Sequence, residues 1–262
     1  MTFPRFPFRV RCSSMCAIFA YVLTMTAIVW TVLHGAEASG YHWQWYRVPR
    51  FLIRPDGSPG PLLHGAGITL LVSSLGFVGA GVLAMITALL RLSDSIVGRA
   101  MARVYLESIR NTPLLVQIFF IYFVVAPIID IDRLAAAVLA LSLFEGAYAS
   151  EIIRAGILAV PKGQWEGAWS LGMSPGTVYG RIILPQALRH GLPPLTSQGV
   201  SLIKDSALVS TIAIFDLTMQ GQAIVAETFL SFEIWFTVAG MYLVATWSLS
   251  GLAKRLETAR RA

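Results

Sequence analysis

Three ionisable side chains lie near the middle of long apolar stretches of the sequence, where a charge is costly unless a partner or a ligand binds it. They are Glu145, Lys204 and Asp205. A cation beside carboxylates can bind a ligand that carries both charges, or the three groups can bind one another as a buried structural network. Adjacent helical residues do not face each other. Lys204 and Asp205 therefore reach different neighbours, and Lys204 with Glu145 is one candidate pair.

Polar uncharged side chains in the same stretches are weaker candidates for ligand contacts, because such residues often only bridge helices. They are Thr112, Gln117 and Gln198.

The residue patterns of common enzymes and metal sites are absent from the sequence. It contains no G-x-x-x-x-G-K-[ST] phosphate loop, no H-E-x-x-H zinc motif and no G-x-S-x-G nucleophile motif. The four histidines are scattered, and the two cysteines have no second pair to complete a zinc site. We therefore expect no catalytic residue, no metal and no cofactor in this chain, and we expect that it is not an enzyme.

The composition indicates an integral membrane protein. Of 262 residues, 56% are hydrophobic and only 13% are charged, whereas an average soluble domain has about 25% charged residues. The mean hydropathy is +0.68. These values argue against a soluble enzyme, a disordered protein and a disulfide scaffold.

Six stretches approach the length of about 20 apolar residues that crosses a bilayer as a helix. They are residues 15–33, 65–90, 112–129, 134–157, 192–215 and 232–252. Continuous apolar runs predict helices, because the strands of a barrel alternate with period two. The prolines at 193 and 194 predict either a break in the fifth span or a helix that starts just after them.

The basic residues predict the orientation. If the N-terminus is cytoplasmic, fifteen of the twenty Lys and Arg residues lie inside and four lie outside, with Lys204 in a span. Both termini are then cytoplasmic, and the net charge of +6 needs no nucleic acid to explain it. The first span is either a retained anchor or a signal peptide cleaved after residues 36–38, which would leave five spans.

The largest expected cytoplasmic loop contains two short helices, with Pro161 and Pro175 at their starts. Trp165, Trp169 and Met173 are four residues apart and share one stripe. Such a stripe needs a partner, either the chain's own membrane domain or another protein.

This loop resembles a known family. Its residues reproduce the motif E-A-A-x3-G-x9-I-x-L-P, which marks the permease subunits of bacterial ABC importers. The matching positions are Glu166, Gly167, Ala168, Gly172, Ile182, Leu184 and Pro185. Gly167 replaces the first Ala, which weakens the helix by roughly 1 kcal/mol.

Five further motifs are similar to the polar amino acid branch of that family. They are residues 109–117, 147–156, 160–164, 184–195 and 202–208. The resemblance covers about residues 62–253. It implies an all-α transmembrane fold of the type I ABC importer permease, with a five-helix core and an N-terminal helix.

The resemblance also implies a division of the chain. Residues 1–61 form an N-terminal helix and a Trp-rich outer loop, and residues 62–253 form the transmembrane domain. About residues 152–190 are the coupling loop, and residues 254–262 are a basic cytoplasmic tail. By this resemblance, Glu166, Gly167, Ala168 and Gly172 couple the chain to the ATPase subunit. We expect Glu166, Ala168 and Gly172 to share the face that docks on that subunit.

The implied partners are a second permease chain, identical or similar, two ATP-binding subunits and a solute-binding protein outside. ATP and Mg would be bound by the ATPase subunits alone. The implied substrate is a polar amino acid, and the implied location is the bacterial inner (plasma) membrane.

Two candidate residues of the substrate pathway depart from the branch, Ser206 where Thr is common and Gln198 where Asn is common. Residues 196–199 look closer to acidic amino acid permeases than to basic ones. Two rival functions remain: a self-sufficient ion-coupled amino acid carrier or channel, and a membrane-embedded enzyme.

Overall fold

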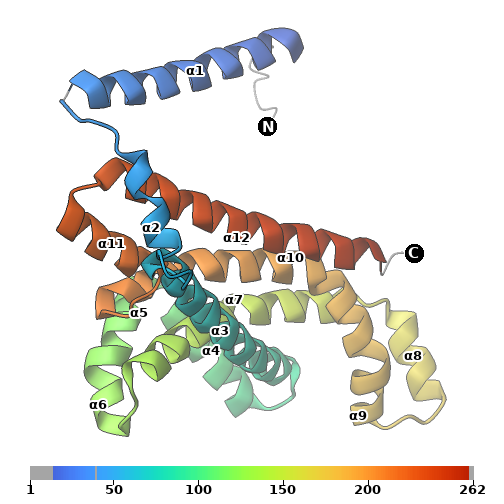
Figure 1. Cartoon of the computed structure of the whole chain (residues 1–262). Helices are drawn as coiled ribbons and strands as arrows, with labels where there is room; N and C mark the ends of the chain where they lie inside the picture. The colour runs from blue at the N-terminus through green and yellow to red at the C-terminus, as the bar shows by residue number, and fades with distance from the viewer. Residues whose placement is uncertain (1–13, 39, 260–262) are drawn as a thin grey trace, which may run out of the picture. The chain divides into compact units, whose positions relative to one another are not determined.

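The computed structural model describes residues 14–38 and 40–259, which are almost entirely helical (Figure 1). These residues form no β-strand beyond one isolated antiparallel bridge between Ile53 and Pro59. The chain divides into two compact units, Met1–Trp45 and Tyr46–Ala262. The all-α fold predicted from the apolar stretches is confirmed.

The described part of the first unit contains one long helix, α1 (Ser14–Ala38). Its large apolar side chains are exposed, including Phe19 and Trp30. Its threonines return their hydroxyl groups to the helix backbone, as Thr24 does to the Ala20 carbonyl oxygen at 2.7 Å. Exposed apolar surface with internally satisfied hydroxyl groups suits a helix surrounded by lipid. Whether this segment is retained or cleaved stays a prediction.

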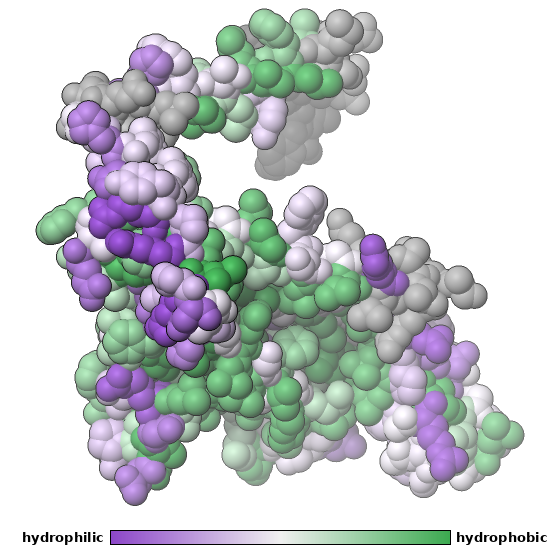
Figure 2. Space-filling view, in the orientation of Figure 1, coloured by the Kyte–Doolittle hydropathy of each residue, from purple (hydrophilic) through white to green (hydrophobic). Residues whose placement is uncertain are grey.

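The second unit is a series of helices joined by short connections. After a 3₁₀ turn, η1 (Trp45–Arg47), they are α2 (Pro49–Leu52), α3 (Pro61–Leu92), α4 (Ile96–Arg110), α5 (Leu114–Phe120), η2 (Ile121–Val125), α6 (Ala126–Ile129), α7 (Arg133–Leu158), α8 (Lys162–Ser170), α9 (Pro175–Thr177), η3 (Val178–Ile183), α10 (Leu184–Asp205), η4 (Ser206–Ile212), α11 (Leu217–Thr228) and α12 (Ser231–Ala259). Figure 2 shows hydrophobic side chains over the body of this unit, with hydrophilic ones gathered near α2, α6 and α8.

Three of the described helices are long and apolar enough to cross a membrane, namely Pro61–Leu92, Arg133–Leu158 and Ser231–Ala253. A fourth crossing results if α4 and Leu114–Ile129 count as one span bent by 108°. Of the other two predicted spans, the first lies in α1, which is apolar over Cys16–Thr31. The other lies in α10, which carries polar and charged residues along its length.

Close packing of α3 against α7 forms the centre of the second unit. A side chain added at Gly79 of α3 would collide with the Ser142 hydroxyl group of α7, and one added at Gly146 of α7 would press on Leu83. Small residues let two helix backbones approach closely within a membrane protein. Large buried side chains fill the space around this contact, among them Val72, Ile118, Leu141 and Leu202.

Two π-helical turns lie just before prolines. The turn η2 precedes Pro127, and η3 precedes Pro185. A proline has no N–H group to donate to the carbonyl oxygen four residues earlier, so the backbone register shifts locally. Because η2 joins α5 to α6 without a break, residues 114–129 form one helical segment, as predicted for 112–129.

The prediction of a break or a helix start at Pro193 and Pro194 is wrong. Both prolines lie inside α10, which is continuous with α9 and η3 from residue 175 onward. Figure 1 shows this ribbon turning along its course rather than ending, which is the usual effect of proline in a long helix. Neighbouring hydroxyl groups give extra hydrogen bonds, as Thr196 does by donating to the Leu192 carbonyl oxygen at 2.8 Å.

The predicted end of the fifth span at residue 215 is also wrong. The α-helix ends at Asp205, and η4 continues as a 3₁₀ helix that stops at Ala213 with a φ of 56°. The chain then enters α11, which the sequence did not predict. Ser206 helps to end α10, because its hydroxyl group donates to the Ile203 carbonyl oxygen at 2.8 Å.

Asp216 fastens α11 to its neighbours. Its side chain is fully buried and accepts a hydrogen bond from the Met219 backbone N–H at 2.9 Å, as the N-cap of α11. It also accepts one from the Tyr242 hydroxyl group of α12 at 3.3 Å. The next N–H, that of Leu217, donates to the Thr69 hydroxyl oxygen of α3 at 3.1 Å. One carboxylate and its neighbouring backbone thus hold three helices together.

Replacing this carboxylate is expected to destabilise the protein. In Asp216→Ala, the N-cap is lost and the Tyr242 hydroxyl group loses an acceptor, which costs about 1–3 kcal/mol. Thermal unfolding of the purified protein, followed by tryptophan fluorescence, measures the change. Asp56→Ala is the control, since Asp56 accepts hydrogen bonds only from Ser58 in an exposed turn. Equal unfolding midpoints for the two variants would contradict the assignment.

Candidate functional site

The helix α8 carries the first half of the predicted coupling motif. Pro161 precedes it, and it ends at Ser170, followed two residues later by Gly172, whose φ of 69° favours glycine. Two contacts hold α8 against the start of the following long helix. The Trp165 ring lies edge-on to the Tyr179 ring at 5.2 Å, and the Gln186 side-chain amide donates to that of Gln164 at 3.2 Å. The short helix therefore packs on the segment that leads into α10.

The predicted docking face of α8 is wrong in one residue. Glu166 and Gly172 are exposed, but Ala168 is only 3% exposed and packs inward against Val178 and Ile183. Gly167 is exposed instead, and a side chain added there would meet nothing. Helical geometry explains the error, because residues two apart lie on nearly opposite faces.

The residues of the stripe formed by Trp165, Trp169 and Met173 differ in their surroundings. Trp165 and Met173 pack against the chain's own core, whereas 56% of Trp169 is exposed. Leu171 beside it is 81% exposed. Exposed apolar side chains at the end of a loop helix leave a surface that another protein can cover.

The second half of the motif leads from the loop into α10. Ile182 and Leu184 are partly buried and pack on the same core as Ala168, while Pro185 is exposed in the first turn of α10. These three residues therefore connect the loop to the long helix rather than offer a docking surface.

A cavity of about 250 Å³ lies between α3, α7 and α10. Its walls are mostly apolar, with Phe77 and Met85 from α3 and Leu195 from α10. Two polar side chains line it, Glu145 of α7 and Gln198 of α10. An apolar cavity with a few polar groups is the usual form of a small-molecule site.

Glu145 is the central polar group of this cavity and is 2% exposed. The Gln198 side-chain amide donates a hydrogen bond to its Oε2 atom, and the Asp205 carboxyl group lies near it. Its Oε1 atom is buried and accepts no hydrogen bond from the described residues. The expected pair of Glu145 with Lys204 does not form, because the Lys204 side chain is exposed.

The other predicted pathway residues lie elsewhere. Ser206 is fully buried and receives a hydrogen bond from the Ser73 hydroxyl group of α3 at 3.1 Å. Gln117 donates to the carbonyl oxygens of Ile109 and Thr112 at 2.7 and 3.0 Å, and to the Thr112 hydroxyl group at 2.8 Å. Gln117 and Thr112 thus hold the α4–α5 turn, and neither lines the Glu145 cavity.

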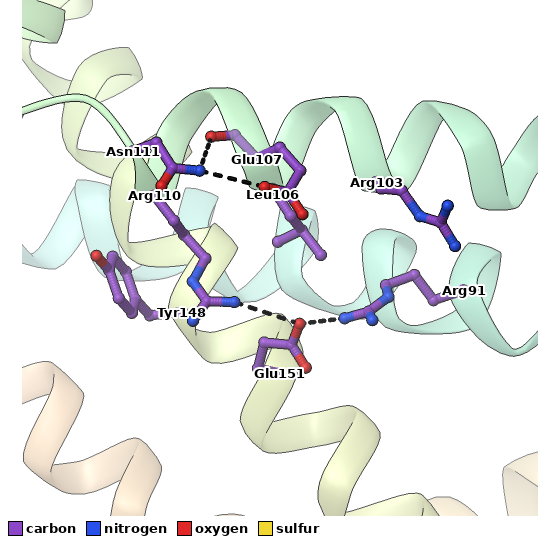
Figure 3. A pocket seen from close by; sticks show the side chains of 8 residues that line it. All are labelled: Arg91, Arg103, Leu106, Glu107, Arg110, Asn111, Tyr148 and Glu151. Atoms are coloured by element: carbon purple, nitrogen blue, oxygen red, sulfur yellow. Dashed lines mark hydrogen bonds and ion pairs between the residues drawn. The ribbon is translucent and has the colours of Figure 1, made fainter.

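A second charged cluster surrounds Glu151, and the sequence reasoning missed it. Arg91 of α3 contacts Glu151 Oε1, Arg154 contacts Oε2 at 3.1 Å, and Arg110 of α4 approaches to 3.6 Å. Figure 3 shows Arg91 and Arg110 reaching Glu151 from two different helices. The spacing of Glu151 and Arg154 predicts one of these pairs. The Arg91 pair depends on the packing of α3 against α7, and the Arg110 pair on the packing of α4 against α7.

The helices α7 and α10 line the cavity and also flank the loop that carries α8. Glu145 lies on α7, which leads into the loop, and Gln198 lies on α10, which leads out of it. The loop that carries α8 is therefore covalently continuous with two walls of the cavity. This is the connectivity that a subunit needs if motion of an external surface is to change an internal site.

The chain is similar to known proteins. Residues 80–262 match the family described as the binding-protein-dependent transport system inner membrane component. The chain is 40% identical over 199 residues to the glutamine transport system permease protein of Escherichia coli strain K12, covering 75% of this chain and 91% of that protein. It is 46% identical over 170 residues to the L-cystine transport system permease protein of Bacillus subtilis strain 168, covering 64% of this chain and 72% of that protein.

Solved structures of ABC transporters are also similar to this chain. A chain from a structure described as an amino acid ABC transporter with histidines is 36% identical, with a TM-score of 0.69, and the match covers 77% of this chain and 94% of that one. A chain of the inward-facing MetNI methionine ABC transporter is 18% identical, with a TM-score of 0.67 over 76% of this chain and 95% of that one, and it supports the fold alone.

These relatives are transport permease subunits rather than enzymes, and they confirm the family expected from the coupling motif. The chain belongs to the family of binding-protein-dependent transport system inner membrane components, and it is a permease of amino acid ABC importers.

Proposed function

We propose that this chain forms half of the pathway for a polar amino acid and couples that pathway to ATP hydrolysis by partner subunits. Its own residues bind neither ATP nor Mg in this proposal, since both belong to the two ATP-binding subunits. The single observation that carries the proposal is the connectivity of α8 with the Glu145 cavity through α7 and α10. A second permease chain, identical or similar, completes the pathway, and a binding protein delivers the solute outside.

The exposed surface of α8 is the proposed contact with the ATPase. Glu166, Gly167, Trp169 and Leu171 are all exposed, and an added side chain at Gly167 would point into open space. A small residue in such a place allows a partner's surface to approach the helix backbone. The packing of Trp165 and Ala168 behind this surface transmits its displacement to α10.

The Glu145 cavity is the proposed solute site. A buried acceptor atom without a donor is costly, and a solute that supplies an N–H group removes the cost. Glu145 Oε1 is such an atom. Asp205 adds a second carboxyl group beside it, so the site suits an ammonium or amide group. Lys204 then acts at the exposed surface of α10, either towards the solute's carboxylate or towards the second permease chain.

These carboxyl groups favour a neutral polar side chain over an acidic one. An acidic amino acid brings a second carboxylate, and like charges repel each other strongly at low dielectric. The side-chain amide of glutamine instead brings N–H donors. The relatives named above transport glutamine and cystine according to their names. We therefore propose glutamine or a similar neutral amino acid, with the acidic substrate expected from residues 196–199 as the alternative.

The proposed location is the bacterial inner membrane, with both termini in the cytoplasm. This orientation places α8 and fifteen of the twenty basic residues inside. It also places α8 where an ATPase has access to it.

A bulky residue on the open face of α8 is expected to uncouple the transporter. In Gly167→Leu, binding-protein-stimulated ATPase activity of the reconstituted complex falls about tenfold, because a crowded contact costs 1–3 kcal/mol. Gly180→Leu in η3 is the matched control, since that glycine is equally exposed and open. Equal ATPase rates in both variants would remove the coupling assignment.

Neutralising the carboxyl group that lies near Glu145 is expected to impair transport. In Asp205→Asn, uptake of labelled glutamine into proteoliposomes falls about tenfold, the size expected for one hydrogen bond to a charged group. Asp94→Asn in the exposed α3–α4 connection is the control. Unchanged uptake kinetics at equal expression would show that Asp205 has a structural function only.

The alternative function is a self-sufficient ion-coupled carrier or channel. Reconstitution of the chain with and without its ATPase subunits distinguishes the two functions. The proposal requires uptake that depends on ATP and on those subunits, and full uptake by the chain alone would refute it.

A further inference from the structure

A second cavity, of about 430 Å³, opens between the end of α3, the side of α4 and α7. It is separate from the Glu145 cavity and shares no lining residue with it. Its walls are polar and include Arg91, Arg103, Glu107, Arg110, Tyr148 and Glu151. Figure 3 shows Arg103 and Arg110 extending from α4 towards this space.

The charges around this cavity do not balance. Four arginines, counting Arg154 beside it, face two glutamates. Glu151 binds three of these arginines, and the Glu107 carboxylate accepts its hydrogen bond from the Asn111 amide instead. Among the described residues, Arg103 has no ion-pair partner. The cavity therefore offers guanidinium groups with N–H donors to spare.

An anion with several oxygen atoms fits this arrangement. The planar guanidinium group matches the geometry of phosphate, and Arg is preferred where phosphate is recognised. Arg110 also stacks on the Tyr148 ring at 5.6 Å, which fixes its direction. A phosphate group beside Arg103 supplies the acceptor that this guanidinium group lacks, and Arg110 lines the same cavity.

The surface of α4 indicates where that phosphate comes from. The helix has three stripes along its length. One is buried and contains Ala102 and Leu106, and one carries Arg103, Glu107 and Arg110. The third is exposed and apolar, at Val97, Met101 and Val104. Their i, i+4, i+7 spacing places these three residues on one face beside the arginines.

An exposed apolar stripe beside a basic stripe is the pattern of a helix that lies in the membrane interface. Acyl chains cover the apolar stripe while the headgroup lies next to the basic residues. We propose that this cavity binds the phosphate of an anionic phospholipid, with Arg103 as the principal contact and Arg110 as the second. The site is independent of the solute cavity.

The test uses the assembled transporter, purified with its partner subunits and stripped of lipid. Native mass spectrometry measures binding of phosphatidylglycerol, of phosphatidylcholine with the same acyl chains, and of inorganic phosphate. We expect phosphatidylglycerol to bind about fivefold more tightly than phosphatidylcholine, as one basic residue near the surface provides. Equal binding of the two lipids refutes the proposal. Displacement of phosphatidylglycerol by inorganic phosphate at equal concentration overturns the lipid assignment.

Variants of α4 distinguish lipid binding at this cavity from non-specific electrostatic attraction of anionic lipid to the basic residues of the helix. Arg103→Gln is expected to lower phosphatidylglycerol affinity about fivefold, and Arg103→Lys to retain most of it. Arg99→Gln is the matched control, since Arg99 is exposed on the same helix and donates to the Ser93 carbonyl oxygen, outside the cavity. An equal loss in Arg99→Gln and Arg103→Gln refutes the site. Arg103 is exposed and unpaired, so its replacement leaves the fold intact, which the elution volume of the complex checks.

Discussion

The close approach of α3 to α7 is the constraint on which the rest of the second unit depends. Glycine and alanine at the contact leave no room for larger side chains, as the collision expected at Gly79 demonstrates. The approach brings one face of α7 against α3, and Glu145 of α7 lines the cavity there together with Phe77. Two turns further along α7, the same approach brings Glu151 to Arg91 at the end of α3. One helix contact thus positions both polar clusters.

Broken helical register recurs where the chain changes direction or meets a proline. The π turns precede Pro127 and Pro185, and the 3₁₀ helix η4 follows Asp205. Hydroxyl and carboxyl side chains then satisfy backbone groups that the broken register leaves free, as Asp216 does at the start of α11. In an apolar environment no water replaces these bonds, so the irregular segments depend on specific side chains.

Much of this arrangement follows from the sequence, but not all. The apolar runs predicted the helices at 65–90, 112–129, 134–157 and 232–252, because length and hydropathy determine them locally. The continuation of α10 through Pro193 was missed, since proline rules describe isolated helices and not a helix supported by packing. The partner of Glu145 was also missed. Which residue meets it depends on the rotation of α10 about its axis, and hydropathy does not report that rotation.

The hydrogen bond from Gln198 to Glu145 closes a ring in the chain. The ring runs down α7, through the loop with α8, and back up α10, so a side-chain contact joins two positions 53 residues apart. A force applied at α8 either moves α7 and α10 together or breaks the hydrogen bond between Gln198 and Glu145. Any solute group that takes the Gln198 amide as its own partner weakens the closure. Binding in the cavity and the stiffness of the distant loop are then thermodynamically coupled, so that a change in one changes the other.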